Sequence, residues 1–285
     1  MILQRVIVCG LVLACGTAAN ADVVHRYSFT SDASESVGGA HGTVVDAGGP
    51  TAVFGGGLLD LSANTGQGSN GITEDAYVDL PNGIVTAATN SGAAGQLTVE
   101  IWARSAENRN WAALFSAGTS NDGEDTSSAG FASDYIQIIP QNGANGLIRT
   151  TTHAANVGAE GFVDYTSAMS TTQTTHLVSV YDQSGGLPGT VTLYIDGSPV
   201  SSAAVAAGLD IGAMPDVNNW LGRSQWNDSV FDGSYDEMRI HNMAVSVNYV
   251  AASFQLGPDR LVPEPTSLVL LALAGGMLAA ARRRK

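Results

Sequence analysis

Residues 191–197 read VTLYIDG, and this short stretch is the clearest indication of the fold. Val191, Leu193 and Ile195 alternate with Thr, Tyr and Asp, and a period of two residues is typical of a β-strand that is buried on one face. Residues 97–105, LTVEIWARS, alternate in the same way. Both stretches therefore predict strands that cover a hydrophobic core.

Short β-type runs recur every dozen or so residues, separated by clusters of Gly, Asn, Asp and Ser. Only residues 245–255 have a helical pattern. Many strands with almost no helix predict an all-β domain, an antiparallel β-sandwich or jelly roll, because parallel sheets need crossover helices. We expect this single domain to span residues 22–257. The other expected strands are residues 23–29, 58–62, 76–80, 112–117, 135–140, 147–152, 176–181, 219–222 and 235–241.

The charge of the chain excludes one class of function. The 285 residues carry 26 acidic and 12 basic side chains, for a formal charge of −14. Five of the basic residues lie in the terminal segments, Arg5 and residues 282–285, which leaves seven between residues 22 and 281. Such an acidic body repels nucleic acid, so we expect no nucleic-acid partner.

The N-terminal segment predicts export. Residues 1–21 have one positive charge, an apolar run and the small-residue site Ala19-Asn20-Ala21, which is typical of a secretory signal peptide cut before Asp22. Residues 13–16 loosely match a lipobox, so a lipoprotein whose mature chain begins at Cys15 is the alternative. Cys9 and Cys15 are the only cysteines, so the body has no disulfide or thiolate site, and its stability must come from a large core.

The C-terminal end combines three features in a fixed order. Residues 262–265 read VPEP, and two prolines keep such a stretch extended and exposed to a processing enzyme. Residues 268–281 contain no charge, and residues 282–285 are RRRK, which includes the only lysine of the chain. A bilayer span needs about 20 apolar residues, so this one is short. The basic end predicts a cytoplasmic C-terminus with the body outside.

This order of motif, apolar span and arginine cluster resembles the PEP-CTERM sorting signal of Gram-negative bacteria. The resemblance implies an exosortase-type processing enzyme as a partner, with Pro263, Glu264 and Pro265 as the sorting motif in a Pro-rich linker of residues 258–265. Residues 266–285 are then a membrane anchor, kept or removed, and we expect a terminal signal helix at each end of the chain. The implied location is the cell surface or the extracellular polysaccharide matrix.

The order of motifs in the body resembles the LamG-like, concanavalin A-like lectin/glucanase jelly roll. Residues 23–45, VVHRYSFTSDASESVGGAHGTVV, are similar to its first strand and Gly-rich turn, and residues 190–200, TVTLYIDGSPV, to a hairpin with Asp-Gly. The closing stretch, residues 218–254, contains Gly-Arg, Phe-x-Gly and Asp-Glu-x-Arg-Ile, followed by a short helix. The resemblance covers nearly all of residues 23–254.

Glycosidase chemistry needs two carboxyl groups about 5 Å apart in retaining enzymes, which one strand can provide at i, i+2. The related glucanases use a Glu-x-Asp-x-x-Glu run, which is missing here, and the adjacent Asp236 and Glu237 face opposite sides of a strand. Five scattered histidines form no zinc helix. We therefore expect no enzyme. The alternative is a glycoside hydrolase or lyase assembled from distant residues, which two carboxylates converging in one groove would indicate.

The resemblance also implies one structural Ca²⁺ between the first turn and the closing strand. Asp236 matches the family's aspartate in the closing strand, whereas Ser34 stands where the first turn should supply another, so Asp32 or Glu35 is the available substitute. Asp236 has a second interpretation, a strand-end carboxylate bonded to Arg239 or to backbone amides. The acidic run at residues 121–125 is interpreted as a solvated loop.

Sugar binding uses exposed aromatic rings beside amides and carboxylates. Trp226, among Gln, Asn and Asp, is the best candidate together with Asn227, whereas Trp220 also fits the core and Trp102 matches the family's core tryptophan. Trp111 is a further candidate. We expect a surface-sorted, non-catalytic module that binds glycan or a protein partner in the extracellular polysaccharide. A structural matrix protein without a defined ligand is the alternative.

Overall fold

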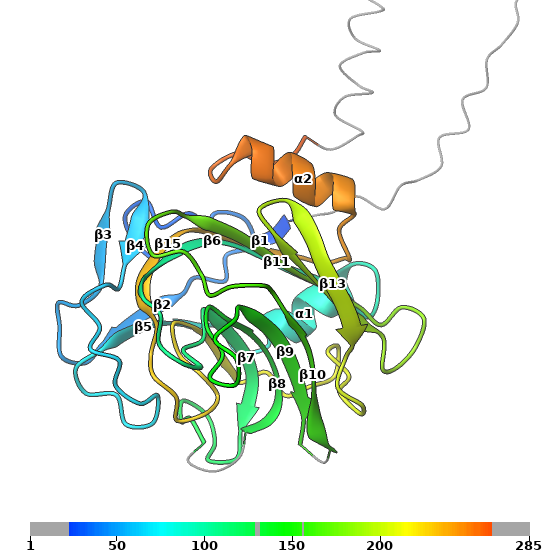
Figure 1. Ribbon diagram of the computed structural model, residues 1–285, viewed down its shortest axis with the longest axis horizontal. Coiled ribbons are helices and arrows are strands. Elements are labelled where there is room, and N and C mark those ends of the chain that lie inside the picture. The colour runs from blue at the N-terminus through cyan, green and yellow to red at the C-terminus, as the bar shows by residue number, and fades with distance from the viewer. Residues whose placement is uncertain (1–22, 129–131, 156, 264–285) are drawn as a thin grey trace, which may run out of the picture.

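Two antiparallel β-sheets stack on one another in the computed structural model (Figure 1), which describes residues 23–128, 132–155 and 157–263. The eight-stranded sheet has the order β13-β12-β11-β6-β15-β4-β3, with β1 paired to β15, and the seven-stranded sheet has the order β10-β9-β8-β7-β14-β5-β2. Every strand pair is antiparallel. The expected all-β sandwich is confirmed.

The strands of the eight-stranded sheet are β1 (Val23–Tyr27), β3 (Val53–Gly55), β4 (Leu58–Asp60), β6 (Gln96–Glu107), β11 (Thr175–Asp182), β12 (Thr190–Ile195), β13 (Ser198–Ala204) and β15 (Asp232–His241). Those of the seven-stranded sheet are β2 (Thr43–Asp46), β5 (Ala76–Leu80), β7 (Phe115–Ser120), β8 (Ala132–Ile139), β9 (Arg149–Ala154), β10 (Val157–Asp164) and β14 (Asn218–Leu221).

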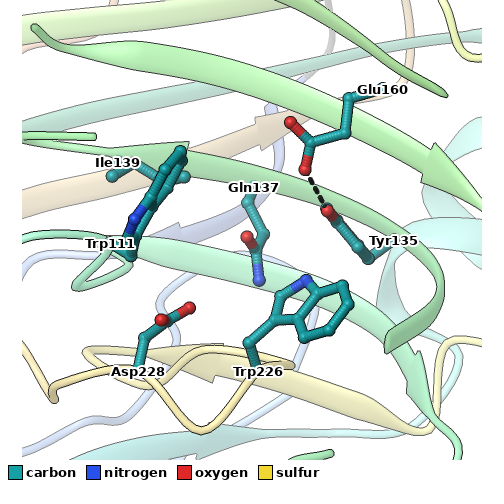
Figure 2. Close-up of a pocket in the computed structure, with 7 residues that line it drawn as sticks. All are labelled: Trp111, Tyr135, Gln137, Ile139, Glu160, Trp226 and Asp228. Atoms are coloured by element: carbon teal, nitrogen blue, oxygen red, sulfur yellow. Dashed lines mark hydrogen bonds between the residues drawn. The ribbon is translucent and has the colours of Figure 1, made fainter. Parts of the chain in front are cut away.

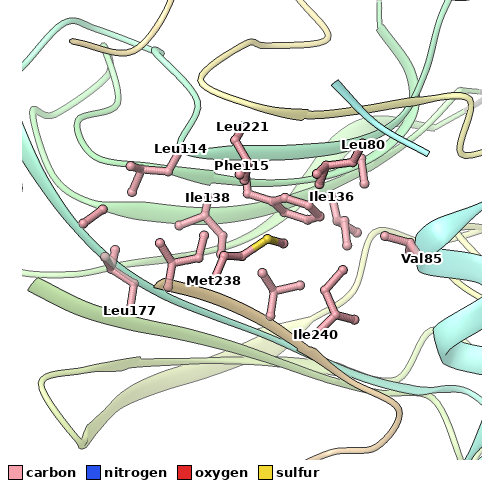
Figure 3. Packing of buried hydrophobic residues seen from close by; sticks show 14 of the residues in the cluster. Leu80, Val85, Leu114, Phe115, Ile136, Ile138, Leu177, Leu221, Met238 and Ile240 are labelled. Carbon is pink, nitrogen blue, oxygen red and sulfur yellow. The ribbon is translucent and has the colours of Figure 1, made fainter. Parts of the chain in front are cut away.

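The core lies between the sheets, as Figure 3 shows. Met238 and Ile240 of β15 face Phe115 of β7 and Ile136 of β8 across the sandwich, and all four are fully buried. The alternation that predicted these strands explains the packing, because every second side chain points inward. Burial of each such side chain contributes about 1.5–3 kcal/mol, so a core of this extent needs no disulfide.

The helix expected at residues 245–255 is confirmed as α2 (Val247–Leu256), which covers the outer face of the eight-stranded sheet. It begins at Ser246, whose hydroxyl accepts a hydrogen bond from the Tyr249 amide. Val250 packs beneath it against Val178 of β11.

A second helix, α1 (Ile84–Ser91), was not expected, and its position corrects the prediction of a single helix. Its first residue follows Gly83, which provides no side-chain cap. The carboxylate of Asp216, distant in the sequence, accepts hydrogen bonds from the amides of Val85 and Thr86 at 2.8 and 3.2 Å. The helix is therefore started by a tertiary contact, which the local sequence does not reveal.

The position of Trp102 differs from the expectation that it lies in the core. Trp102 is buried, but its neighbours on β6, Ile101 and Ala103, are the ones that point between the sheets. The indole lies on the outer face, stacked on His176 with ring centroids 4.3 Å apart and 4.4 Å from the Arg239 guanidinium. Alternation along the strand places it there.

The predicted signal peptide and membrane anchor lie outside the described residues. Within residues 23–128, 132–155 and 157–263, neither helix has the length and apolar character that crossing a bilayer requires. The described chain ends at Pro263, the first proline of the sorting motif. Just before it, the amide of Asp259 donates to Glu237 at 2.9 Å, and Arg239 donates to the carbonyl of Arg260 at 3.1 Å. These contacts hold the last described residues against β15.

Candidate functional site

The outer face of the seven-stranded sheet carries polar and aromatic side chains. Ile136 and Ile138 of β8 are fully buried in the core, so Tyr135, Gln137 and Ile139 between and beside them point to the opposite face. The regular pleat of β8 thus places a phenol and an amide next to each other above the sheet.

Strands β9 and β10 extend this face. The Tyr135 hydroxyl donates to the carboxylate of Glu160 on β10. Arg149 on β9 approaches the same carboxylate at 3.5 Å, but it donates two shorter hydrogen bonds, of 2.7 and 2.9 Å, to Asp164. Its guanidinium also lies 3.7 Å from the centre of the Phe162 ring. Arg149 is therefore held mainly by partners on its own sheet.

Trp111 enters from the loop between β6 and β7. Its φ of 64° lies in the left-handed region, and its amide donates to the Gln141 carbonyl at 2.8 Å. Gly143 packs directly against the indole, because a Cβ at this position would lie 2.2 Å from Trp111 Nε1. The absence of a side chain at Gly143 thus allows the indole to take this position.

Trp226 and Asp228 come from the loop that joins β14 to β15. Backbone hydrogen bonds tie this loop to a second one. The Ser128 amide donates to the Gln225 carbonyl at 2.7 Å, and the Asn227 amide donates to the Ser128 carbonyl at 2.9 Å. The two loops brace each other over the sheet, so Trp226 and Asp228 are presented from a hydrogen-bonded segment.

Together these elements enclose a pocket, here called the aromatic pocket (Figure 2). Its volume is about 190 Å³, roughly that of six water molecules. In Figure 2, Trp111 and Trp226 lie on either side of Gln137, and the carboxylates of Glu160 and Asp228 lie at opposite ends. The lining residues are Trp111, Tyr135, Gln137, Ile139, Glu160, Trp226 and Asp228.

Gln137 leaves one hydrogen-bond acceptor for a ligand. Its Nε2 donates to the hydroxyls of Ser116 and Ser224 at 3.1 and 3.2 Å, and the residue is only 2% exposed. Its Oε1 accepts no hydrogen bond from the described residues. Since Gln137 lines the pocket, this oxygen can accept a hydrogen bond from solvent or from a ligand.

The two acidic groups of the pocket differ in environment. Burial raises the pKa of Asp228 to about 6, a hydrogen bond from the Ser224 hydroxyl offsets part of that rise, and the nearby charge of Glu160 adds to it. Burial, together with the charge of Glu160, also raises the pKa of the Tyr135 phenol. Tyr135 therefore stays protonated and keeps donating to Glu160, while Asp228 titrates close to neutrality.

The structure places the predicted aromatic residues as follows. Trp226 is half-buried and lines the aromatic pocket with Trp111. Asn227 is exposed, and its side-chain oxygen accepts from the Asn70 amide at 2.8 Å, so it supports a neighbouring loop. Trp220 is fully buried beneath Arg223, whose guanidinium lies 4.1 Å from the ring centre. The ligand-binding role of Trp226 and Asn227 stays a prediction.

The residues predicted to bind calcium have the following surroundings in the structure. Asp32 is exposed and accepts from the Ser34 amide at 2.8 Å, whereas Glu35 is buried and accepts from backbone amides of its own turn and from His25. Asp236 is half-buried, and burial with the charges of Asp259 and Glu237 raises its pKa to about 6. No group of three His, Cys, Asp or Glu suited to a metal ion occurs in the part of the chain that the structure describes. The calcium site stays a prediction.

Tyr135, Gln137, Glu160 and Asp228 were not singled out from the sequence. The stretch YIQII at residues 135–139 did indicate a strand with one polar face, because Tyr135 and Gln137, whose side chains end in polar groups, alternate with isoleucine. Glu160 and Asp228 are separated from it and from each other, so only the folded sheet brings them together. Both carboxylates line the same pocket, but they lie at its opposite ends, whereas the arrangement expected of an enzyme is two carboxylates that converge.

Family models match two parts of the chain. Residues 72–251 match the model described as the concanavalin A-like lectin/glucanases superfamily. Residues 261–285 match the PEP-CTERM protein-sorting motif. No curated protein matches the chain in sequence.

Several solved structures are similar to this chain. Domain 4 of AbnA, a GH43 extracellular arabinanase from Geobacillus stearothermophilus in complex with arabinotriose, is 22% identical; the match covers 81% of this chain and 98% of that one, with a TM-score of 0.54. The NanB sialidase of Streptococcus pneumoniae is 20% identical, with 67% and 27% covered and a TM-score of 0.46. The CBM40 of the Ruminococcus gnavus IT-sialidase, bound to α2,3-sialyllactose, is 14% identical, with 55% and 81% covered and a TM-score of 0.41. At such identities the likeness concerns the fold alone.

Proposed function

The chain belongs to the concanavalin A-like lectin/glucanases superfamily, and from that premise we propose that it binds a glycan of the extracellular polysaccharide in the aromatic pocket without cleaving it. Its PEP-CTERM motif makes it an exported, surface-sorted protein that is anchored in the membrane by its C-terminal segment before processing by an exosortase-type system.

The observation that carries this proposal is the composition of the aromatic pocket. Two half-buried indoles offer apolar rings for a pyranose or furanose, while Gln137, Glu160 and Asp228 offer polar groups that orient hydroxyls. A volume of about 190 Å³ is below that of sites for drug-sized ligands, which suits one sugar ring of a longer chain. The related fold of AbnA domain 4 is recorded with arabinotriose, a short glycan.

A fragment of residues 22–263 is suited to the test, because all described strands, both helices and the core lie within it. We expect it to be retarded in native gels that contain the producing organism's exopolysaccharide. Trp226→Ala should weaken retention about tenfold, since a lost ring contact costs roughly 1–2 kcal/mol. Phe254→Ala, an exposed ring on α2, is the matched control and should bind normally. Absence of retention would favour a structural matrix role or a protein partner.

Glycoside hydrolysis is a second candidate function, favoured by one observation. Asp228, with a pKa raised to about 6 by burial, lines the same pocket as Glu160. A carboxyl group that is partly protonated near neutrality can donate a proton to the leaving glycosidic oxygen, and a second carboxylate can act as base or nucleophile. Release of reducing ends from the polysaccharide by the fragment, abolished in Asp228→Asn, would establish this activity. Binding without release would leave the non-catalytic proposal in place.

A further inference from the structure

We infer that the aromatic pocket takes an organic ammonium group, and that its glycan ligand is therefore an amino sugar with a free amine. This inference rests on the proposed function, since it names the class of sugar bound at the same site. It follows from three properties of the pocket: its aromatic walls, its excess of acceptors and its charge.

The walls of the pocket suit a cation. Trp111, Tyr135 and Trp226 provide three aromatic rings around one small hollow, and cages of this kind recognise ammonium groups through the negative faces of the rings. The contribution is largest where water is excluded. Trp111 and Trp226 are half-buried, and Tyr135 is fully buried with its ring stacked on His153 at 5.1 Å, so a cation would meet mainly the two indoles.

Most of the polar groups that the pocket offers to a ligand are hydrogen-bond acceptors. The Tyr135 hydroxyl already donates to Glu160, and both protons of the Gln137 amide go to serine hydroxyls. The acceptors left for a ligand are the Gln137 carbonyl oxygen and the carboxylates of Glu160 and Asp228, against one donor, the Trp111 indole N–H, which lies beside Gly143. A protonated amine has three donors and no acceptor, which complements this set, whereas a hydroxyl or an acetamido group brings acceptors as well.

The charge of the pocket excludes acidic sugars. None of its seven lining residues is basic. The Arg149 guanidinium is paired with Glu160 at 3.5 Å and lies 5.6 Å from the centre of the Trp111 ring, while its two short hydrogen bonds go to Asp164. One guanidinium against the carboxylates of Glu160, Asp164 and Asp228 still leaves the site negative. A uronate or a sialic acid would place a carboxylate against two others, while an ammonium forms charge-assisted hydrogen bonds there.

A metal ion is a poorer fit than an ammonium. Ca²⁺ takes six to eight oxygen ligands, and the pocket offers two carboxylates and one amide oxygen beside three aromatic rings. Aromatic carbon supplies no ligand to a hard cation, but it supplies favourable contacts to an organic one.

The test is calorimetric titration of the fragment of residues 22–263 at pH 7. The probes are the trimers of glucosamine, N-acetylglucosamine and glucose, an oligomer of glucuronate, and tetramethylammonium as a cation without a sugar. We expect the glucosamine trimer to bind at least about tenfold more tightly than the acetylated or neutral trimer, and the uronate to show no binding. Tetramethylammonium should compete for the same site.

Variants separate charge from packing. Glu160→Gln and Asp228→Asn keep the shape of the pocket and remove its charge, so each should weaken the glucosamine trimer about tenfold. Asp210→Asn, an exposed carboxylate outside the pocket, should bind like the wild type. Thermal melts of each variant show whether it is folded, and the probe comparison on wild-type protein stands even where a variant is not.

The outcomes are distinguishable. Equal binding of the three trimers would overturn the ammonium inference and leave glycan binding intact. Binding of tetramethylammonium without any sugar would support the ammonium site and overturn the glycan function. Binding of none of the probes, or of the uronate alone, would overturn the inference directly.

Discussion

Glu100 and His176 share a hydrogen bond of 2.9 Å beneath α2, although both side chains are excluded from solvent. His241 approaches the other carboxylate oxygen at 3.0 Å, and Arg239 lies 3.5 Å from it. Among the described residues, the Nδ1 atoms of both histidines are buried without a partner, so each ring contacts Glu100 through Nε2 alone. Arg239 pairs with both Glu100 and Glu237, and Arg26 pairs with Glu237.

Replacement of Glu100 should therefore destabilise the domain strongly. Glu100→Gln removes one charge of the buried network and leaves Arg239 less well compensated, for which a loss of about 3–5 kcal/mol in the free energy of unfolding is expected. Chemical denaturation of the fragment measures this loss. Glu107→Gln on the same strand, where the carboxylate is exposed, serves as the control and should change stability by less than about 0.5 kcal/mol. Similar stabilities for the two variants would contradict the network.

The lowered pKa of Glu100 predicts that the fold loses stability in acid. Burial alone would raise the pKa of Glu100, but the hydrogen bonds from His176 and His241 outweigh burial and hold it well below its ordinary value. Because the unfolded chain takes up the proton at higher pH, this stabilisation is present at neutrality and is lost as pH falls. We expect the free energy of unfolding to drop between about pH 5 and pH 3. Glu100→Gln should show a flatter profile over that range.

The sandwich was predictable because its inner strands obey a local rule. Val191, Leu193 and Ile195 alternate, and all three are buried. The side chains on the outer faces of the two sheets follow no such local rule, because the segments that bury them are distant in the sequence. The family resemblance placed Trp102 in the core and the sequence left Trp220 open between the core and a ligand site, whereas Trp102 stacks on His176 and Trp220 lies beneath Arg223.

The candidate site was predictable only in part for a related reason. Trp226 stands among polar residues in a loop, and that local context is visible in the sequence. Glu160 enters the pocket because β10 pairs with β9 at the sheet edge, and Asp228 because its loop crosses the sheet. Neither position has a local signature, so the pairing of the two carboxylates depends on topology.

Asp216 offers a test of the tertiary cap on α1. Asp216→Ala removes the acceptor of the Val85 and Thr86 amides, which should cost about 1–2 kcal/mol of stability, as for other lost helix caps. Asp216→Asn keeps an oxygen in place and should cost less. Urea denaturation measures both variants, with Asp210→Asn as an exposed control. An unchanged midpoint in Asp216→Ala would show that α1 does not depend on this contact.

The raised pKa of Asp228 predicts opposite pH effects on stability and on binding. Because burial raises the folded-state pKa to about 6, the ionised carboxylate destabilises the fold above that pH, and the penalty fades as pH falls through 6 towards the unfolded value. Asp228→Asn should therefore raise the melting temperature at pH 8 and have little effect at pH 4. Ammonium binding should weaken below about pH 6 as the charge is lost. Glu160 and Tyr135 line the same pocket, and Arg149 and His153 lie against them from behind its lining, so the Asn variant is needed to assign the change.

Gly143 offers the most selective way to disturb the aromatic pocket. In Gly143→Ala the new Cβ would lie 2.2 Å from Trp111 Nε1, so the indole must move, while the core between the sheets is untouched. We expect ligand affinity to fall about tenfold with only a small change in melting temperature, since one ring of the cage is displaced. Gly146→Ala lies on the same loop with no atom near its Cβ, but its φ of +77° strains any side chain, so it controls for backbone effects. If Gly143→Ala bound the glycan as tightly as the wild type, Trp111 would have no part in recognition. The binding site would then consist of Tyr135, Trp226 and the two carboxylates.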